Sequence, residues 1–308
     1  MIYKTINPVA IVIFNREDKA AHLYEALKKV QPQKLFIIAD GPRNETETEK
    51  CERTRRVFEK IEWPCTIIRN YSDTNLGCAR RVASGFDWVF QNVEQAILIE
   101  DDCIPSVDFF RFCDEMLQRY KNDTRIMQVC GTNLLKQWDT DGDSYFFSQW
   151  ASCWGWATWA RAWKLFDFDI KKWRSKRVKK LLKQNLGNLI YNSKKKSYDE
   201  YYFKTVTITE WDRQWEFIRS IYNGLSVTPS VNLVVNIGGG ADATHTHDMT
   251  SLSIPALPMQ FPLRHPICVM PDRAFNLKMV EMVNDIKPLY KKAFRKAKRI
   301  LLKNNHIS

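Results

Sequence analysis

The sequence predicts an α/β protein built on a mainly parallel sheet with helices on its faces, and three observations support this prediction. Continuous apolar, β-branched segments occur at residues 8–14, 35–39 and 96–99, as expected for strands that are buried on both faces of a sheet. Segments in which apolar residues recur at helical spacing lie between them. Strands that alternate with helices in this way form parallel sheets with right-handed crossovers.

The elements follow one another in a regular order over the first 100 residues. After the strand at 8–14, apolar residues recur at helical spacing as far as Pro32, which ends this helix before the second strand. The elements predicted next are a helix at about 45–60, a strand at 65–68, a helix at about 78–91 and the strand at 96–99.

Beyond residue 130 the pattern becomes less regular. Residues 150–159 are dense in tryptophan, and aromatic residues at such spacing usually belong to a core, although Trp154 or Trp156 could contact a sugar. The elements expected next are helices and loops in a basic stretch at 171–196, an apolar helix that opens at 210–215 and a strand at 231–235. Proline recurs between 255 and 271, which predicts an extended, irregular crossing.

Composition limits the class of protein. The 308 residues contain neither an apolar segment of about 18 residues that could cross a bilayer nor a recognisable secretion signal, so we expect a cytoplasmic protein. Eight cysteines are scattered without metal-binding spacing, which predicts free thiols in a reducing compartment. The net charge of +12 indicates an anionic partner, and nucleic acid, a membrane surface or phosphorylated small molecules would each fit.

The last stretch of the chain carries much of this charge. Apolar residues recur at helical spacing between 286 and 301, and lysines and arginines fill the positions between them. Such a basic amphipathic helix is typical of proteins that lie on an anionic membrane surface, here the inner face of the cell membrane. A solvated surface helix is the other interpretation.

Polar residues follow three of the predicted strands. Arg16 comes after the first strand, Asp40 after the second, and Glu100, Asp101 and Asp102 after the strand at 96–99. Because ligands of such sheets bind beyond the carboxyl ends of the strands, these side chains are expected to meet at one ligand-binding edge.

Three consecutive acids, Glu100, Asp101 and Asp102, end a buried strand. Like charges this close repel each other unless a cation or a proton compensates them. Mn²⁺ or Mg²⁺ suits carboxylate oxygens and often completes its ligand shell with substrate phosphates. The alternative is that the two aspartates only favour the N-terminus of a helix starting near Ser106.

Residues 96–110, AILIEDDCIPSVDFF, resemble the acidic metal motif of GT-A-fold glycosyltransferases such as N-acetylglucosaminyltransferase I and bacterial polysaccharide-biosynthesis enzymes. The resemblance implies that Asp102 ligates the metal, that Glu100 hydrogen-bonds the ribose or nearby donor atoms, and that Asp101 positions the diphosphate. Arg16 lies in a segment similar to the nucleotide-contacting turn of the family, and Asp40 in one similar to its base-recognising segment.

Three further segments match the same family. Arg80 lies in NLGCAR at 75–80, which resembles a donor-side loop, although a solvated surface arginine is an equal alternative. Asp212, in a tryptophan–aspartate pair, would be the base that deprotonates the acceptor hydroxyl. Glu210 is the other candidate base, and a helix-terminal acid without a catalytic role is the third interpretation. His245 lies in a glycine-rich segment at 236–246 and would bind the metal or the diphosphate.

The resemblance therefore implies a metal-dependent hexosyltransferase. It would move a sugar from a UDP-linked donor to a hydroxyl of a glycan or lipid-linked glycan, with inversion, in cell-surface polysaccharide synthesis. The GT-A catalytic domain would cover 1–250, with a donor half at about 1–130 and an acceptor half at about 131–250. The proline-rich crossing and the basic helix would cover 251–308.

Two other classes compete with this interpretation. A sugar-phosphate nucleotidyltransferase would also use an α/β sheet and a metal-binding aspartate, but no glycine-rich phosphate loop follows the first strand. A basic nucleic-acid-binding protein would account for the charge, but none of the common recognition motifs occurs, so no nucleic-acid partner is expected.

Overall fold

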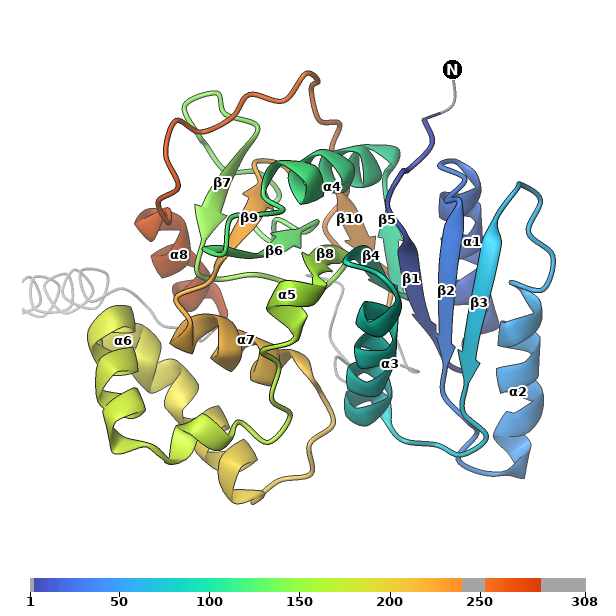
Figure 1. The fold of residues 1–308 in the computed structure, drawn as a ribbon, viewed down its shortest axis with the longest axis horizontal. Coiled ribbons are helices and arrows are strands. Elements are labelled where there is room, and N and C mark those ends of the chain that lie inside the picture. Colours follow the sequence, from blue (N-terminus) through green and yellow to red (C-terminus); the bar gives the residue numbers. More distant parts are fainter. Residues whose placement is uncertain (1–2, 240–252, 284–308) are drawn as a thin grey trace, which may run out of the picture.

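The computed structural model describes residues 3–239 and 253–283 and confirms the predicted fold class (Figure 1). Eight strands form one sheet in the order β3-β2-β1-β4-β8-β6-β9-β7. The strands of its first half are β1 (Val9–Ile13), β2 (Lys34–Ala39), β3 (Thr66–Tyr71) and β4 (Gln95–Glu100). These four strands are parallel to one another, so their carboxyl ends share one edge of the sheet.

The second half of the sheet is mixed. It contains β6 (Ile126–Cys130), β7 (Tyr145–Ser148), β8 (Trp156–Trp159) and β9 (Leu225–Pro229). Strand β8 runs antiparallel to both β4 and β6, β9 is parallel to β6, and β7 is antiparallel to β9. A separate antiparallel pair joins β5 (Cys103–Pro105) to β10 (Val234–Asn236). The strand predicted at 231–235 is thus found only in its last part.

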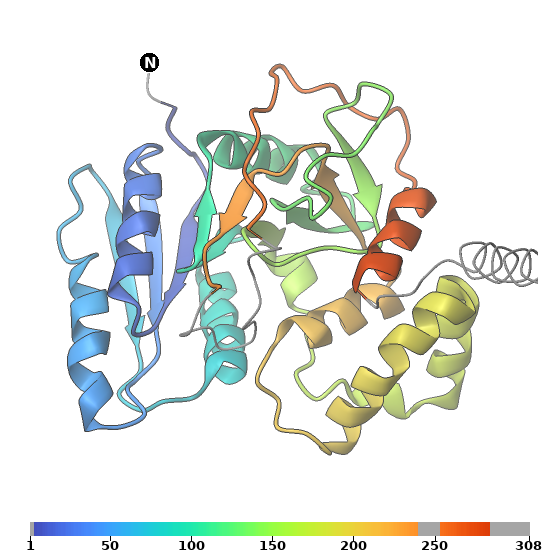
Figure 2. The same ribbon diagram turned by 180° about the vertical axis from the view of Figure 1, so that it is seen from behind.

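Helices cover both faces of the sheet. The helices of the first half are α1 (Glu17–Lys28), α2 (Glu45–Arg56), α3 (Cys78–Asn92) and α4 (Val107–Arg119). Those that follow are α5 (Ala160–Trp163), the 3₁₀ helix η1 (Lys171–Arg174), α6 (Lys176–Phe203), α7 (Asp212–Ile221) and α8 (Arg273–Val283). Helices α3, α5 and α7 lie on one face, and α1 is seen on the other when the molecule is viewed from behind (Figure 2).

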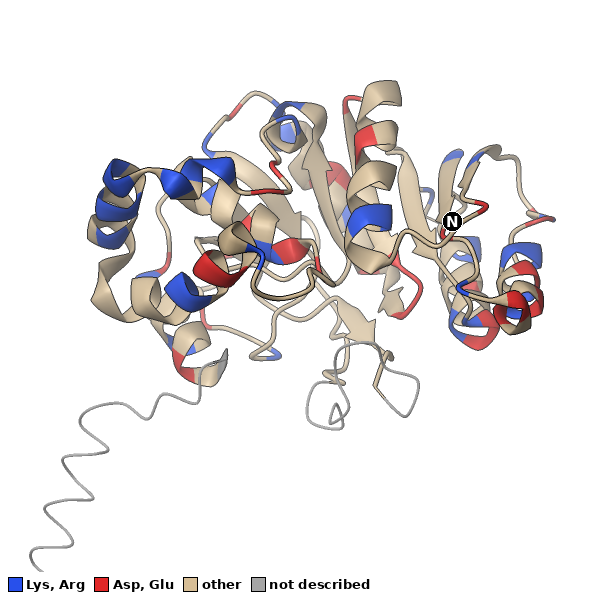
Figure 3. Ribbon diagram, turned by 90° about the horizontal axis from the view of Figure 1, so that it is seen from below, with Lys and Arg blue, Asp and Glu red and all other residues tan. Residues whose placement is uncertain are grey.

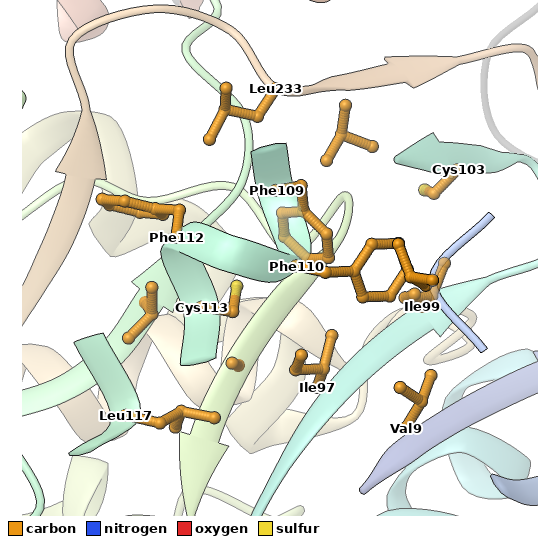
Figure 4. Close-up of a cluster of buried hydrophobic side chains, with 14 of the residues drawn as sticks. Val9, Ile97, Ile99, Cys103, Phe109, Phe110, Phe112, Cys113, Leu117 and Leu233 are labelled. Carbon is orange, nitrogen blue, oxygen red and sulfur yellow. The ribbon is translucent and has the colours of Figure 1, made fainter. Parts of the chain in front are cut away.

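Alternate residues of each central strand face different cores. On β4, Ile97 and Ile99 point to the core that contains α1 and α4, whereas Ala96 and Leu98 point to the core that contains α3 and α7. Figure 4 shows the first of these cores, where Phe109 and Phe110 of α4 lie over β4. Burial on both faces explains why the interior positions of these strands are apolar.

Residues 3–7 are fixed to α4 by Asp114. This buried carboxylate accepts hydrogen bonds from the Tyr3 hydroxyl (2.6 Å), the Thr5 hydroxyl (3.0 Å) and the Asn7 side-chain amide (2.6 Å). The backbone N–H groups of Ile6 and Asn7 also donate to it. The segment therefore holds β1 in place from its amino end.

Other predictions concern the later part of the chain. Residues 253–270 form neither helix nor strand, which confirms an irregular crossing there. The basic helix predicted in the tail lies outside the described residues. Within the described ranges, no helix is both long and apolar enough to span a bilayer. All eight cysteines are free thiols, as the sequence predicts.

Candidate functional site

The acidic cluster, defined as Glu100, Asp101 and Asp102, stands between β4 and β5. Strand β4 ends at Glu100, and the Asp101 N–H donates to the Val12 carbonyl at 3.0 Å, so the cluster begins where the sheet ends. Asp101 is buried, with 3% of its side chain exposed, whereas 19% of the Asp102 side chain is exposed. Asp102 is therefore the aspartate of the two that a ligand can reach.

Arg16, which comes directly after β1, bridges the two aspartates. Its guanidinium forms a short ion pair with Asp101 and lies 3.0 Å from the carboxylate of Asp102. Burial opposes the positive charge, but the two carboxylates outweigh it and raise the pKa of Arg16. Burial raises the pKa of Asp101 to about 6, against the opposing effect of Arg16. Arg16 therefore contacts the acidic cluster, as the sequence predicts.

The pKa of Glu100 reflects the repulsion between neighbouring carboxylates that the sequence predicts. Desolvation by the surrounding protein, followed by the charges of Asp102, Asp101 and Asp212, raises its pKa to about 8. A hydrogen bond from the Trp211 side chain acts in the opposite direction. Glu100 is thus a carboxyl group that lacks a sufficient counter-charge.

Asp212, the first residue of α7, approaches the same place from the other half of the chain. Its charge helps to raise the pKa of Glu100, although 112 positions separate the two residues (212 minus 100). Burial, followed by the charge of Glu210, raises the pKa of Asp212 itself. Its Oδ1 atom is buried without a hydrogen-bond partner. The structure therefore brings together the acidic cluster and the sequence-predicted base.

Aromatic packing fixes α7 at this position. Trp211 stacks on Trp156 with ring centroids 5.5 Å apart, and Trp215 lies against Trp163 at 5.4 Å. The Trp215 indole N–H also donates to Gln128 of β6 at 2.9 Å. Trp156 has only 1% of its surface exposed, so its proposed contact with an acceptor is wrong and it belongs to the core.

The segment after β10 lies directly on Asp102. The Ile237 N–H donates to the Asp102 carbonyl at 2.8 Å, and β10 pairs with β5, which follows the acidic cluster. A Cβ atom at Gly238 would lie 2.4 Å from the Asp102 carboxylate oxygen. Only glycine therefore leaves the carboxylate where it is. Sequence analysis identified the glycine run but not this contact, which depends on the pairing of distant strands.

The carboxylate of Asp40 is hydrogen-bonded to backbone groups of the protein. It is buried and accepts hydrogen bonds from the N–H groups of Gly41 (3.0 Å), Leu76 (2.9 Å) and Gly77 (3.0 Å). These bonds tie the end of β2 to the loop that precedes α3. Recognition of a nucleotide base by Asp40 remains a prediction.

Arg80 and Arg81 take different positions on α3. Arg80 is exposed, and its guanidinium lies 5.0 Å from the centroid of the Phe168 ring. Arg81 is buried and donates to the Ala39 carbonyl at 3.1 Å and to the Asn70 side chain at 2.8 Å. A donor contact by Arg80 remains a prediction, and the buried Arg81 was missed because a pair of arginines does not show which one faces the sheet.

Cys78, at the start of α3, borders the acidic cluster and was also missed. Burial, followed by the charges of Glu100, Asp212 and Asp102, raises the pKa of its thiol. The N-terminus of α3 is therefore a third element that reaches this edge of the sheet.

The described residues fit a divalent cation that takes most of its ligands from a substrate. No group of three or more histidine, cysteine, aspartate or glutamate side chains in residues 3–239 and 253–283 is arranged to hold a metal. Mg²⁺, however, needs only one or two carboxylates when phosphates supply other ligands. Asp102 is partly exposed and can supply one such carboxylate. His245 lies outside the described residues.

No family model matches the chain, and no curated protein does. Some solved structures share part of the fold. A cytidylyltransferase from Leptospira borgpetersenii serovar Hardjo-bovis is 12% identical with a TM-score of 0.31, over 53% of this chain and 64% of that one, less than two thirds of its length. A UDP-glucose pyrophosphorylase complexed with UDP-glucose is 10% identical with a TM-score of 0.30, over 52% and 79%.

A third structure, a 4-diphosphocytidyl-2C-methyl-D-erythritol synthase from Anaerococcus prevotii, is 9% identical with a TM-score of 0.36, over 74% of this chain and 90% of that one. All three proteins are nucleotidyltransferases, one of the two alternative classes named above, and not glycosyltransferases. The likeness concerns the α/β fold, and TM-scores this low carry no argument about activity.

Proposed function

We propose that this chain is a transferase that binds a nucleoside diphosphate sugar at the acidic cluster and moves the sugar to a hydroxyl of a glycan acceptor. The observation that supports this most is the meeting of carboxyl groups from two elements, the acidic cluster after β4 and Asp212 at the start of α7. Glycosyl transfer needs both a site for the diphosphate and a base on the acceptor side.

The donor side is formed by Asp102 and Arg16. Asp102 would hold Mn²⁺ or Mg²⁺, and the cation would stabilise the negative charge that develops on the leaving diphosphate. Arg16 keeps Asp101 and Asp102 at a fixed separation through its two ion pairs. Gly238 leaves room for the Asp102 carboxylate to keep this orientation.

The acceptor side is formed by Asp212. Its raised pKa makes it a stronger base than an exposed aspartate, and its unpartnered Oδ1 can accept the proton of an acceptor hydroxyl. In the reaction a bond forms between the acceptor oxygen and the anomeric carbon, while the bond from that carbon to the diphosphate breaks. Attack from the side opposite the diphosphate inverts the anomeric configuration.

Nucleotidyl transfer is the second candidate. An edge of the sheet that binds a nucleotide and a cation would serve either reaction. One feature of the chain favours glycosyl transfer. Strand β1 passes into α1 through Phe14, Asn15 and Arg16, so no glycine-rich phosphate loop stands between them.

A product assay separates the two candidates. Purified protein with Mn²⁺ is offered a panel of UDP-linked sugars and glycan acceptors, and the release of UDP is followed beside the release or consumption of pyrophosphate. We expect UDP release that is lost with EDTA and in Asp102→Asn. Pyrophosphate turnover without UDP release would establish the nucleotidyltransferase instead, and donor turnover that Asp102→Asn leaves unchanged would exclude the proposed cation site.

A further inference from the structure

A strongly basic surface lies on η1 and the first half of α6, far from the acidic cluster in sequence. No aspartate or glutamate occurs between residues 170 and 198. Six exposed cations there form neither an ion pair nor a side-chain hydrogen bond with any residue that the structure describes, whereas Lys172 donates to the Tyr222 hydroxyl. We call them the basic face: Lys171, Arg174, Lys176, Arg177, Lys180 and Lys183.

Helical geometry places four of these cations together. Val178, Leu182 and Leu186 recur every four residues and turn inward, with Leu182 and Leu186 buried. The side of α6 opposite to them carries Lys176, Arg177, Lys180 and Lys183, all exposed. The inward leucines are therefore needed for the core of the protein, whereas the cations have no structural partner in it.

The second half of α6 differs in its electrostatics. Gly187, with φ of 76°, interrupts the helix, and beyond it Lys195 pairs with Asp199 and Lys196 with Glu200. Positive charge there is compensated by carboxylates of α6 and, for Lys194, by Glu216 of α7. Figure 3 shows lysine and arginine gathering on this helical end of the molecule. Within η1 and α6, the uncompensated charge thus lies on η1 and the first half of the helix.

Exposed leucines accompany the cations. Leu181 is 54% exposed next to Lys180, and Leu189 is 44% exposed just past the interruption. A surface that binds only phosphates of a nucleic acid gains nothing from exposed aliphatic side chains. A membrane interface accepts both, because lysine and arginine bind anionic headgroups while leucine enters the acyl boundary.

We propose that the basic face, with Leu181 and Leu189, docks on the surface of an anionic phospholipid membrane. This proposal does not depend on the transferase activity or on the tail beyond residue 283. Each basic residue near such a surface contributes about 1 kcal/mol of binding, so losing four is expected to lower the partition coefficient by about two to three orders of magnitude at low salt.

The test is co-sedimentation of the full chain with vesicles of phosphatidylcholine alone or of phosphatidylcholine with about 30% phosphatidylglycerol. This fraction gives the vesicle a negative surface charge similar to that of an anionic membrane leaflet. The variant changes Lys176, Arg177, Lys180 and Lys183 to Gln. The matched control changes Lys4, Lys29, Lys50 and Lys60 to Gln, which are exposed, lie in the first 60 residues and remove the same net charge. Circular dichroism verifies that both variants fold.

We expect the wild type and the control to bind only the anionic vesicles, and the basic-face variant to bind them about two to three orders of magnitude more weakly at low salt. Leu181→Gln should weaken binding several-fold without changing its salt dependence. Equal binding by the basic-face variant, equal loss in the control, or binding of the wild type to duplex DNA but not to vesicles would each overturn the proposal.

Discussion

The two halves of this protein place their charges differently. In the first half, strands β1 to β4 are parallel, and the polar groups Arg16, Asp40 and the acidic cluster all follow carboxyl ends of strands. In the second half the sheet is mixed, Asp212 stands at the start of a helix, and the free positive charge lies on the outside of α6. Parallel strands bring side chains together at one edge of the sheet because their carboxyl ends coincide. The strands of a mixed sheet do not end at one edge, and here the functional group is carried by the start of a helix.

This difference suggests a division of labour. The first half would hold the donor through Asp102 and Arg16, and the second would supply the base for the acceptor through Asp212. Four substitutions can break or sharpen this comparison, because each belongs to one half and predicts a different pattern of lost binding and lost turnover.

Asp212→Asn should have the largest effect. Removing the base is expected to lower kcat by about 10²- to 10⁴-fold and to leave the affinity for the donor unchanged. Because the pKa of Asp212 is raised, the wild-type kcat should fall with acidification through a pKa above the ordinary aspartate value of 3.8, since the base works only when it is deprotonated. Rates of UDP release across pH, with donor titration by calorimetry, check both. Weakened donor binding in Asp212→Asn would contradict the assignment of donor binding to the first half and of the base to the second.

Arg16→Gln should destabilise the first half. It leaves the buried Asp101 without its cation, which is expected to lower the free energy of unfolding by about 3 kcal/mol. The double variant with Asp101→Asn should recover most of this loss, because the uncompensated charge is then gone. Urea titration of the single and double variants measures the coupling. Additive losses would show that the ion pair has no energetic role.

Asp102→Asn should weaken the donor rather than the fold. The amide cannot replace the carboxylate as a cation ligand, so donor affinity in Mn²⁺ is expected to fall by about 10- to 100-fold. The midpoint of thermal unfolding should hardly change, because Asp102 is partly exposed. The comparison with Asp212→Asn is direct, since one variant loses binding and the other loses turnover.

Gly238→Ala should have the smallest of the four effects. The new methyl group would displace the Asp102 carboxylate, which can rotate away, so donor affinity should fall by about 10-fold while the fold is kept. Gly187→Ala is the control, because there is open space around it but its φ is 76°, and it should cost about 1 to 3 kcal/mol of stability without affecting the donor. Equal donor affinity in Gly238→Ala and the wild type would show that the glycine does not position Asp102.

The sequence predicted the first half well because its signals are local. Apolar runs mark β1, β2 and β4 within one or two residues, and polar residues directly after them indicate the edge where Arg16 meets the acidic cluster. Doubly buried strands need continuous apolar sequence, and this leaves little ambiguity.

The second half was harder to predict for a physical reason. Strand β8 lies within the tryptophan tract and is buried in the middle of the sheet, so its sequence does not alternate and resembles any buried segment. The contact of Gly238 with Asp102 and the approach of Asp212 to Glu100 depend on pairings across more than 100 residues. Asp212 was reached through the family resemblance, because the periodicity around it indicates only a helix.

The position of Asp212 depends on aromatic packing as well as on its own element. Trp156, Trp163 and Trp215 hold the helix that carries Asp212. Displacing a reacting group by about 1 Å can cost a factor of 100 in rate. A saturation screen scored on activity should therefore mark these tryptophans as strongly as the carboxylates, whereas a screen scored on abundance would separate the two groups.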